Sequence, residues 1–471
     1  MRKKRGWLSA LLILSWLSVP AFAGSWTKYG GDEGHSRASK DESRINKNNV
    51  DNLRLLWEQD APGVTCDPVV QNDVVYWVDW HGGVYANNVN NGRQIWKTSV
   101  GRGDKGGASG TPALVDGYLY TVTQGGLVVK LDADNGRIQW RTQIQADSHM
   151  KIYSSPAIAD GVLVIGVSGD GTSRDGIALD QRILDRWRGS VQGFDTESGK
   201  KLWEFETTRG PSGRLYSGGV SVWSSATIDR KRGLAYIGTG NSYNRPASPY
   251  SDSLLALDYR TGELEWHIQF TEGDAFRSVR PSGGPDYDVG ATPNFFNVGG
   301  RDLIGVGDKG GTYYVVDPET RRVVWERNLK NGSSLGGIMA SAAYHDGTIY
   351  VSTNNGQIDM NYYIFALDAR NGRVKWSNET DGFKGIVPVT WANGVIYAGA
   401  GMFRISLGSL RPHFTAYDAS NGRQLWQEFM DAPVGSGVTV ADGRVFVGYG
   451  LHFQSPSDWD RKGGLRVYAL R

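Results

Sequence analysis

Residues 132–140 read DADNGRIQW, and the phrase they contain recurs along the chain: an Asp, a Gly four residues later and a Trp four residues after that. The five clear copies are Asp132-Gly136-Trp140, Asp195-Gly199-Trp203, Asp258-Gly262-Trp266, Asp368-Gly372-Trp376 and Asp418-Gly422-Trp426. Two degenerate copies are Asn88-Gly92-Trp96 and Asp317-Arg321-Trp325, and an eighth tryptophan, Trp57, stands without the turn. Such periodicity predicts a fold built from repeated units.

The chemistry of this phrase is that of a β-hairpin. Asp and Gly favour tight turns, and Gly takes the positive φ that such turns require. The flanking residues alternate between apolar and polar, as in RIQWRTQ (137–143), and this is the period of a β-strand. A Trp at a constant offset from the turn can therefore pack as a wedge between neighbouring sheets, where it buries roughly 200 Å².

A second phrase lies between the Trp motifs: a small residue, often followed by Pro, then two short apolar strands joined by a turn. TPALVDGYLYTVT (111–123) and SPAIADGVLVIGVS (155–168) are clear examples, and the chain contains eight copies. Two strands from each phrase make a four-stranded antiparallel blade, so the sequence predicts an all-β, eight-bladed β-propeller. An all-β sandwich does not account for eight matched copies. GLRVYALR (464–471) resembles the strand missing before Trp57, so we expect the last strand to complete a composite blade with the N-terminal segment.

Residues 1–23 have the pattern of a signal peptide: four basic residues at 2–5, an apolar run from Trp7 to Val19, and small residues at Ala21 and Ala23. An uncleaved membrane anchor is the alternative. We expect residues 24–471 to form a single propeller domain in the periplasm, with no membrane span after cleavage. The 51 basic residues nearly balance the 49 acidic ones, which predicts no nucleic-acid partner.

Cys66 is the single cysteine, so no disulfide can form within the chain and no C-x-x-C-H haem motif exists. Wide spacing between the central Trp motifs predicts insertions near residues 170–190, 207–220, 242–252, 271–288 and 402–412. Long loops on one face of a rigid scaffold usually carry function.

Several specific strings resemble those of the pyrroloquinoline quinone (PQQ)-dependent dehydrogenases. They are YGGDEGHSRAS (29–39), INKNNVDNLRLLWE (45–58), VWSSATIDRKRGLAYIGTGNSY (222–243) and GPDYDVGATP (284–293). The resemblance covers essentially the whole chain and is greatest to polyvinyl-alcohol dehydrogenase-like propellers. It implies PQQ as cofactor, with a calcium ion or, as in some methanol dehydrogenases, a lanthanide.

The resemblance implies a role for each of three residues toward the cofactor. Trp223 matches the tryptophan that forms the floor under the quinone ring, and Lys309 matches the basic residue that contacts the quinone oxygens. Asp286 matches the catalytic carboxylate, which takes the alcohol proton and also ligates the metal. Each has a structural alternative: a wedge Trp, a solvated hairpin Lys, and an exposed acidic loop.

The remaining implied residues concern the metal ion. Asn241 matches the family's amide ligand to calcium, and its alternative role is to cap a strand end. Asp288, two residues after Asp286, lies on the same side of an extended chain and matches the second carboxylate of the lanthanide enzymes. Asp170 is the nearest candidate for a glutamate that the family places after the GVS strand.

Other positions depart from the family pattern. Gly110 stands where an arginine is expected to grip the quinone, and Tyr153 stands where a threonine is expected. The vicinal disulfide of the alcohol-oxidising branch is impossible with one cysteine. Arg102, Lys105 and Arg174 are candidates to replace the missing cation.

Three functions are compatible with these patterns. The first is a dehydrogenase that oxidises a small or polymeric alcohol and passes electrons to a separate acceptor, such as a c-type cytochrome. The second is a non-catalytic propeller that acts as a binding or assembly scaffold of the cell envelope. The third is a propeller that binds a different ligand or metal in the same central funnel. A fold alone does not decide between them.

Overall fold

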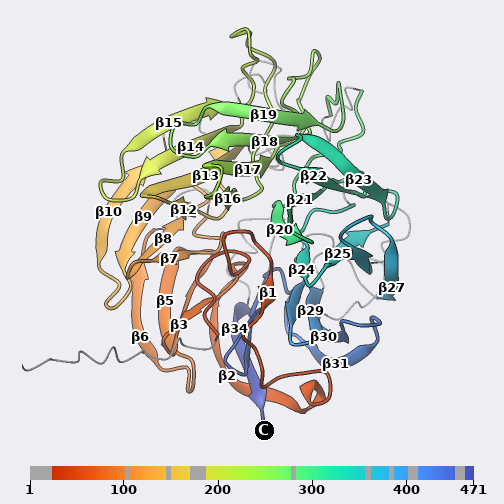
Figure 1. Ribbon diagram of the computed structural model, residues 1–471. Helices are drawn as coiled ribbons and strands as arrows, with labels where there is room; N and C mark the ends of the chain where they lie inside the picture. The colour runs from red at the N-terminus through yellow and green to blue at the C-terminus, as the bar shows by residue number, and fades with distance from the viewer. Residues whose placement is uncertain are drawn as a thin grey trace, which may run out of the picture.

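The computed structural model describes residues 24–101, 106–144, 150–169, 187–276, 283–334, 336–355, 362–380, 387–400, 412–450 and 462–471. The expected signal peptide at 1–23 lies outside these residues. Eight small antiparallel sheets stand around a central axis as the blades of a propeller (Figure 1), which confirms the predicted fold. Besides the strands, one short 3₁₀ helix, η1 (Val50–Asn52), occurs in the described part.

The first four blades follow one another along the chain. Blade 1 has β3 (Val69–Gln71), β4 (Val74–Val78), β5 (Gly83–Asn88) and β6 (Gln94–Ser99). Blade 2 has β7 (Ala113–Val115), β8 (Tyr118–Val122), β9 (Leu127–Asp132) and β10 (Ile138–Gln143). Blade 3 has β12 (Ala157–Ala159), β13 (Val162–Gly169), β14 (Ser190–Asp195) and β15 (Lys201–Glu206), with β11 (Met150–Lys151) added beside β13. Blade 4 has β16 (Thr227–Asp229), β17 (Leu234–Gly238), β18 (Ser253–Asp258) and β19 (Leu264–Gln269).

The second half of the ring repeats this order. Blade 5 has β20 (Asn294–Val298), β21 (Arg301–Gly307), β22 (Thr312–Asp317) and β23 (Arg322–Asn328). Blade 6 has β24 (Ala343–His345), β25 (Thr348–Asn354), β26 (Tyr362–Asp368) and β27 (Val374–Thr380). Blade 7 has β28 (Thr390–Ala392), β29 (Val395–Ala400), β30 (His413–Asp418) and β31 (Gln424–Phe429), with β1 (Ala38–Ser39) parallel to β28. Blade 8 has β32 (Thr439–Ala441), β33 (Arg444–Tyr449), β34 (Lys462–Leu470) and β2 (Leu53–Pro62).

Blade 8 is the predicted composite blade. Its outer strand β2 comes from the N-terminal part of the chain and pairs antiparallel with β34, from Leu53 opposite Leu470 to Pro62 opposite Lys462. Main-chain hydrogen bonds between chain segments some 400 residues apart therefore close the ring.

The Asp-Gly-Trp phrase joins each blade to the next. The indole Nε1 of Trp203 in blade 3 donates to the carbonyl of Tyr259 in blade 4 (3.1 Å), one residue after the Asp of the next phrase. The Trp203 ring lies against Gly262 of that same phrase, where a Cβ atom would overlap it. Trp57, Trp96, Trp140, Trp325 and Trp376 make the same bond at 2.8–3.1 Å. The wedge role predicted for these residues is thus confirmed.

The second phrase builds an inner belt of hydrogen bonds. Its small residue carries a hydroxyl that accepts the main-chain N–H at the same position of the preceding blade. The N–H groups of Asp67, Thr111, Ser155 and Ser225 donate at 2.8–2.9 Å to the side chains of Thr111, Ser155, Ser225 and Thr292 respectively. This belt fixes the first strands of blades 1 to 5 relative to one another around the axis.

The segment from Trp26 to Glu42 lies across one end of the axis, in the middle of the ring in Figure 1. It contacts blades 1, 2, 4, 5, 6, 7 and 8 in chain order, through bonds to Val70, Leu114, Ile228, Phe295, Tyr344, Trp391 and Gly443. We call this segment the plug. Arg37 within it is fully buried and forms an ion pair with buried Asp67 at 2.8 Å.

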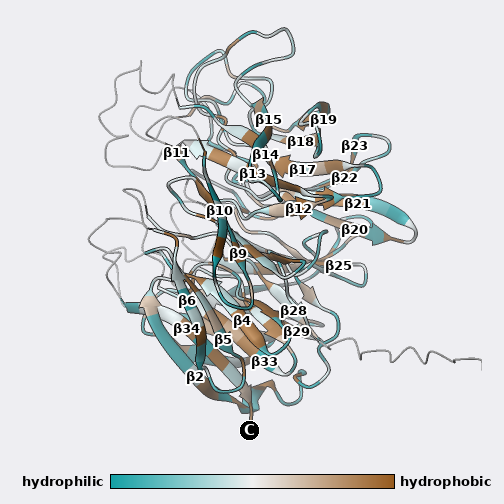
Figure 2. Cartoon of the chain, turned by 90° about the vertical axis from the view of Figure 1, so that its left-hand side faces the viewer, coloured by the Kyte–Doolittle hydropathy of each residue, from teal (hydrophilic) through white to brown (hydrophobic). Residues whose placement is uncertain are grey.

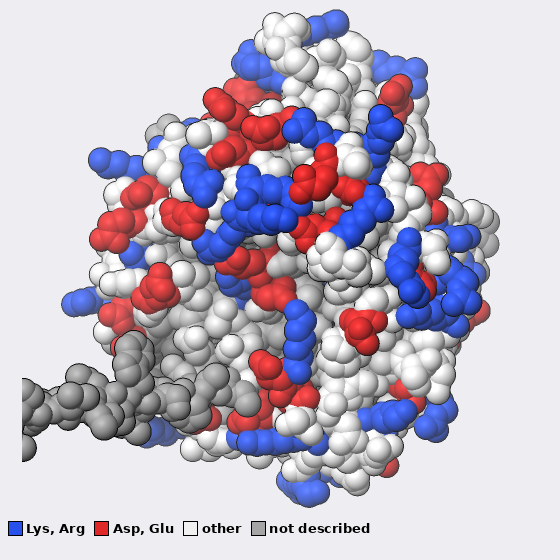
Figure 3. Space-filling model, viewed as in Figure 1, with Lys and Arg blue, Asp and Glu red and all other residues white. Residues whose placement is uncertain are grey.

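The loops of the protein differ between its two faces. In every blade the connection after the second strand and the connection to the next blade lie at the same end, because successive strands are antiparallel. Described parts of the predicted insertions, 207–220 and 242–252, belong to these connections. Figure 2 shows the ring from the side, with the outer strands β6 and β10 toward the viewer. On the opposite face, seen in Figure 3, acidic and basic side chains are interleaved.

Candidate functional site

Five residues that the sequence singles out meet between blades 4 and 5. Trp223 precedes β16, Asn241 follows β17, Asp286 and Asp288 precede β20, and Lys309 follows β21. First strands begin and second strands end at the face that carries the insertions. Antiparallel pairing therefore brings together residues that are far apart in the sequence. The sixth residue, Asp170, lies outside the described part of the chain, as do Arg102, Lys105 and Arg174.

Lys309 is the centre of the cluster. Its Nζ lies 2.7 Å from Oδ2 of Asp286 and 3.2 Å from Oδ2 of Asp288, and all three side chains are buried. The two carboxylates face the same ammonium group, in agreement with the alternation of the PDYD stretch. The main chain of Lys309 is also fixed, since its N–H donates to the carbonyl of Asp288 (3.0 Å).

Asn241 is oriented by three hydrogen bonds. Its main-chain N–H donates to Oδ1 of Asp288 (2.7 Å), and its Nδ2 donates to the carbonyls of Ser242 (2.6 Å) and Phe276 (2.8 Å). Both amide hydrogens are thereby used. The side-chain Oδ1 accepts no hydrogen bond from the described residues and remains a hard-oxygen donor, the kind of ligand that calcium and lanthanide ions prefer.

Trp223 is half-buried and lies over a glycine. A Cβ atom at Gly290 would overlap the outer edge of its ring, so only glycine allows this close approach. No ring pair among the described residues includes Trp223, unlike many other aromatic residues of the chain. Sequence reasoning missed the role of Gly290, although its place in DYDVGATP, two residues after Asp288, was a usable signal.

Two further acidic residues near this cluster were also missed. Asp252 immediately precedes β18, the third strand of blade 4, and is fully buried. Asp274 is 1% exposed, and its Oδ2 accepts the N–H of Tyr287 (2.9 Å). Neither belongs to a recognisable motif, and only the folded chain brings them beside Asp286 and Asp288.

Burial controls the electrostatics of the cluster. Burial first and then the charge of Asp288 raise the pKa of Asp286 to about 7, despite the opposing effect of Lys309. Burial disfavours the charged form of Lys309, but the charges of Asp288 and Asp286 outweigh it and raise the pKa of the ammonium group. Burial also raises the pKa of Asp274. The cluster thus contains a carboxyl group that titrates near neutrality beside a permanent cation, a combination typical of acid–base sites.

The departures from the family pattern lie on the same side of the molecule. A side chain at Gly110 would contact the carbonyl oxygen of Ser154 at 2.8 Å, so the main chain of the next blade takes the space. Among the described residues, no group of three or more His, Cys, Asp or Glu side chains is close enough to form a metal shell.

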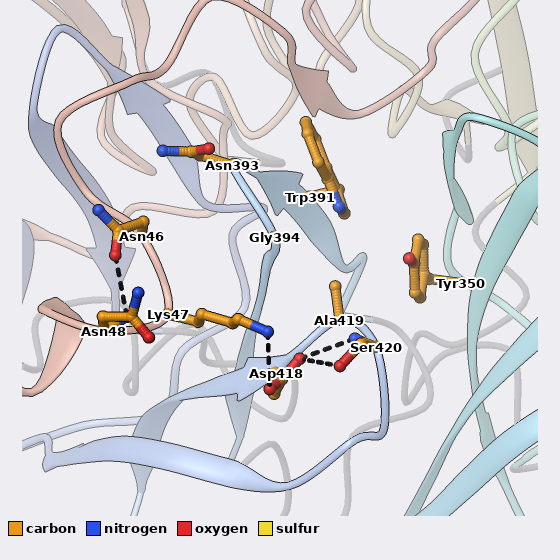
Figure 4. Close-up of a pocket in the computed structure, with 10 residues that line it drawn as sticks. All are labelled: Asn46, Lys47, Asn48, Tyr350, Trp391, Asn393, Gly394, Asp418, Ala419 and Ser420. Carbon is orange, nitrogen blue, oxygen red and sulfur yellow. Dashed lines mark hydrogen bonds and ion pairs between the residues drawn. The ribbon is translucent and has the colours of Figure 1, made fainter.

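A cavity lies elsewhere on the molecule, away from the Lys309 cluster. This cavity of about 410 Å³ opens between residues 46–48, the turns of blade 7 and Tyr350 in β25 of blade 6, with Trp391 and Asn393 also on its walls (Figure 4). Lys47 and Asp418 face each other across it at 3.9 Å. These turns lie at the end of the blades opposite the Lys309 cluster, so this cavity is separate from the candidate site.

None of the described helices is long and apolar enough to cross a membrane.

Comparison with known proteins gives two matching families. Residues 145–330 match the family model described as the β-propeller domain of glucose, ethanol and alcohol dehydrogenases. Residues 309–405 and 360–455 match that of the outer membrane protein assembly factor BamB. Trp223, Asn241, Asp286, Asp288 and Lys309 all lie within the dehydrogenase match.

Individual relatives agree with the first match. The chain is 29% identical over 323 residues to a polyvinylalcohol dehydrogenase of Sphingopyxis sp. (strain 113P3), covering 59% of this chain and 49% of the relative. It therefore spans about half the length of that relative. The fold is that of the quinohemoprotein alcohol dehydrogenase ADHIIG of Pseudomonas putida HK5, with a TM-score of 0.76, 19% identity, and coverage of 95% of this chain and 80% of that one. A europium-containing methanol dehydrogenase has the same fold, with a TM-score of 0.75, 17% identity, and coverage of 96% and 99%.

Proposed function

Because this chain carries the β-propeller of the PQQ-dependent dehydrogenases and has polyvinylalcohol and quinoprotein alcohol dehydrogenases as homologues, we propose that it is an oxidoreductase that oxidises an alcohol with PQQ. The reaction takes place in the funnel between blades 4 and 5, with a calcium or lanthanide ion beside the quinone. The protein acts in the periplasm and passes its electrons to a separate acceptor, such as a c-type cytochrome. The observation that carries the proposal is the buried contact of Lys309 with Asp286 and Asp288.

The residues present fit a flat, anionic quinone. Trp223 offers an aromatic surface, and the glycine at 290 allows the outer edge of that ring to approach the main chain closely. The Lys309 ammonium group supplies a buried positive charge for quinone or carboxylate oxygens.

The residues present also supply part of a cation site. The free Oδ1 of Asn241 and the carboxylates of Asp286 and Asp288 are hard oxygen donors on one side of the funnel. Calcium takes six to eight oxygen ligands, so these three residues are an incomplete shell. The remaining ligands come from the cofactor, from water or from residues outside the described part, Asp170 among them.

Asp286 is the residue that handles the proton. Its carboxylate accepts the proton of the alcohol hydroxyl. In the chain without a bound cation, burial and Asp288 raise the pKa of Asp286 to about 7. Lys309, 2.7 Å away, stabilises the charged form of Asp286 and orients its Oδ2. When bound, the quinone supplies the two-electron acceptor for the hydride of the alcohol carbon.

One observation favours a second candidate function. The chain matches the BamB family model over blades 5 to 8, which supports an assembly scaffold of the cell envelope. The cluster around Lys309 distinguishes the two. A scaffold gains nothing from four buried aspartates at the funnel, whereas a dehydrogenase needs such groups.

Titration of the purified chain with PQQ, with calcium and then with a lanthanide, tests the proposal. We expect saturable binding that requires the metal, and reduction of an artificial dye when an alcohol is added. Asp286→Asn, which keeps the shape of the side chain, should lower the rate of dye reduction at least about 100-fold, because general-base catalysis contributes on that scale.

Asp79→Asn is the matched control, since Asp79 is also buried but lies at a hairpin of blade 1. It should leave PQQ binding and dye reduction unchanged. Absence of PQQ binding with either metal would favour the scaffold function instead.

A further inference from the structure

Asp252 is an aspartate whose charge has no counterpart in the described structure. It is fully buried, and neither carboxylate oxygen has a hydrogen-bond partner among the described residues. Its main chain is held in place by bonds from its own N–H to Gly240 O (3.2 Å) and from Phe270 N–H to its carbonyl (2.9 Å). Its φ of 50° is in the left-handed region, which is unusual for a residue other than Gly. A buried carboxyl group without partners is costly, so its retention requires a reason.

The carboxyl group of Asp252 interacts with the Lys309 cluster. Asp252 lies opposite Gly240, the residue before Asn241, and a Cβ atom on Gly240 would be 2.9 Å from Oδ1 of Asp288. Gly240 therefore separates Asp252 from Asp288, with no side chain of its own between them. The charges that act on Asp252 are those of Asp288, Asp274 and Asp286, in that order.

The charges of this region do not balance. Asp252, Asp274, Asp286 and Asp288 are all buried, and within the described structure Lys309 forms ion pairs with two of them, Asp286 and Asp288. Burial and the charge of Asp288 raise the pKa of Asp252 well above its ordinary value, which disfavours the charged form of this carboxyl group in the protein without a bound cation. A multivalent cation bound in the funnel would offset the repulsion from the neighbouring carboxylates and allow Asp252 to become negatively charged.

We infer that Asp252 is a charge partner of the cation that the funnel binds, placed behind Asp288 and Asn241 and outside the direct ligand shell. The inference rests on the proposed function, because it assumes that a cation occupies this site. Its position behind Gly240 keeps Asp252 outside the shell formed by Asn241, Asp286 and Asp288. Asp252 then sets how strongly the site prefers ions of higher charge.

Coulomb's law gives this inference a specific signature. The attraction between a carboxylate and an ion is proportional to the charge of the ion, so the logarithm of the affinity lost on removing the carboxylate scales as three to two for trivalent against divalent ions. We expect Asp252→Asn to weaken Ca²⁺ binding at least about tenfold and Tb³⁺ binding at least about thirtyfold. The amide keeps the volume of the side chain and removes only its charge.

The experiment uses the full chain without quinone. Tb³⁺ binding is followed by luminescence excited through nearby tryptophan, and Ca²⁺ binding by calorimetry, in wild type, Asp252→Asn and the control Asp79→Asn. The melting temperature of metal-free Asp252→Asn should be equal to or above that of wild type, since an unpartnered buried acid is removed. The melting temperature therefore separates a charge effect from damage to the fold.

Three results would overturn the inference: unchanged affinities in Asp252→Asn, equal fold losses for both ions, or no binding of either ion to the wild-type chain. Failure of the proposed function is detected separately, because it appears as absent PQQ binding or absent dye reduction in a chain that still binds Tb³⁺ through Asp252.

Discussion

His35 is a single residue on which the pH dependence of folding depends. It lies in the plug, where its Nδ1 contacts the hydroxyl of Thr227 (2.9 Å) and its carbonyl accepts Nδ2 of Asn294 (2.6 Å). These two partners begin the first strands that follow Trp223 and Asp288. Complete burial lowers the pKa of His35 to about 3, so its ring stays neutral in the folded protein at any pH at which the protein is handled.

This shift predicts a loss of stability in acid. The unfolded chain binds a proton at His35 near pH 6.5 and the folded chain does not, so the stabilisation is complete above pH 6.5 and decreases as the pH falls. We expect wild type to lose about 1.4 kcal/mol relative to His35→Asn for each pH unit between 6.5 and about 3. Melting temperatures of both proteins at pH 7.5, 5.5 and 4.5 would check this. Parallel pH curves for the two proteins would contradict it.

At this same scale, the sequence predicted the site only in part. The motif residues Asp286, Asp288 and Lys309 do meet, because PDYD precedes the first strand of blade 5 and GDKGG follows its antiparallel neighbour, so both lie at the same end of the blade. Asp252 and Gly290 were not predicted. Their importance comes from burial and from contact with a ring or a charge in the neighbouring chain segment, and such contacts are not encoded in local spacing. The roles of the motif residues toward PQQ and metal stay predictions.

The element that propagates the fold is the turn of the Asp-Gly-Trp phrase. Two physical requirements meet at its glycine: a left-handed φ, which is 75° at Gly262, and contact with the Trp ring of the preceding blade. The degenerate phrase of blade 5 shows that the left-handed φ is the stricter of the two requirements. Arg321 occupies the glycine position of blade 5 with a φ of 57°, so the turn tolerates a side chain at some cost.

Two glycine variants separate the requirements. Gly117 has a φ of 76°, close to that of Gly262, but a Cβ atom there would meet nothing within 4 Å. Gly117→Ala should cost about 1 kcal/mol through backbone strain alone. Gly262→Ala should cost about 1–3 kcal/mol more, because Trp203 must move. Melting temperatures and the fluorescence of the tryptophans report both effects, and equal losses in the two variants would mean that docking of Trp203 contributes little.

Elements of this kind were readable from the sequence because each repeat is locally encoded. The Asp-Gly-Trp phrase determines the position of each turn, and the alternation of apolar and polar residues determines the strands. The eight copies determine the number of blades. What the sequence did not indicate is the inner belt of hydroxyl groups or the plug. Both are made of contacts between different blades, and the plug follows a path that has no repeating pattern.

For the whole molecule, we expect stability to depend on closure of the ring through β2 and β34. Arg54 lies directly opposite Ala469 in this pair, a position from which two cysteines can reach each other. We expect Arg54→Cys with Ala469→Cys to form a disulfide that stabilises the fold by about 4 kcal/mol or more, since it closes a very long loop. The gain in melting temperature should disappear on addition of a reductant.

A disulfide within one blade is the control. Leu127→Cys with Gln143→Cys joins facing residues of β9 and β10 across a short loop and should stabilise by about 3 kcal/mol at most. If the disulfide between β2 and β34 stabilised the fold no more than the disulfide between β9 and β10, separation of β2 from β34 would not be the step that limits stability.

The plug has a consequence for the ancestry of this protein. Tandem repeats gain and lose copies readily when genes recombine, and a ring of similar blades is open to the same events. Here one unrepeated stretch of chain bonds to seven blades in a fixed order, through its main chain at six of them and through the Glu42 carboxylate at blade 8. Duplication or deletion of a blade would shift every later blade away from the plug residue that it contacts. The plug therefore constrains the number of blades to eight, while the sequences of the individual blades continue to diverge.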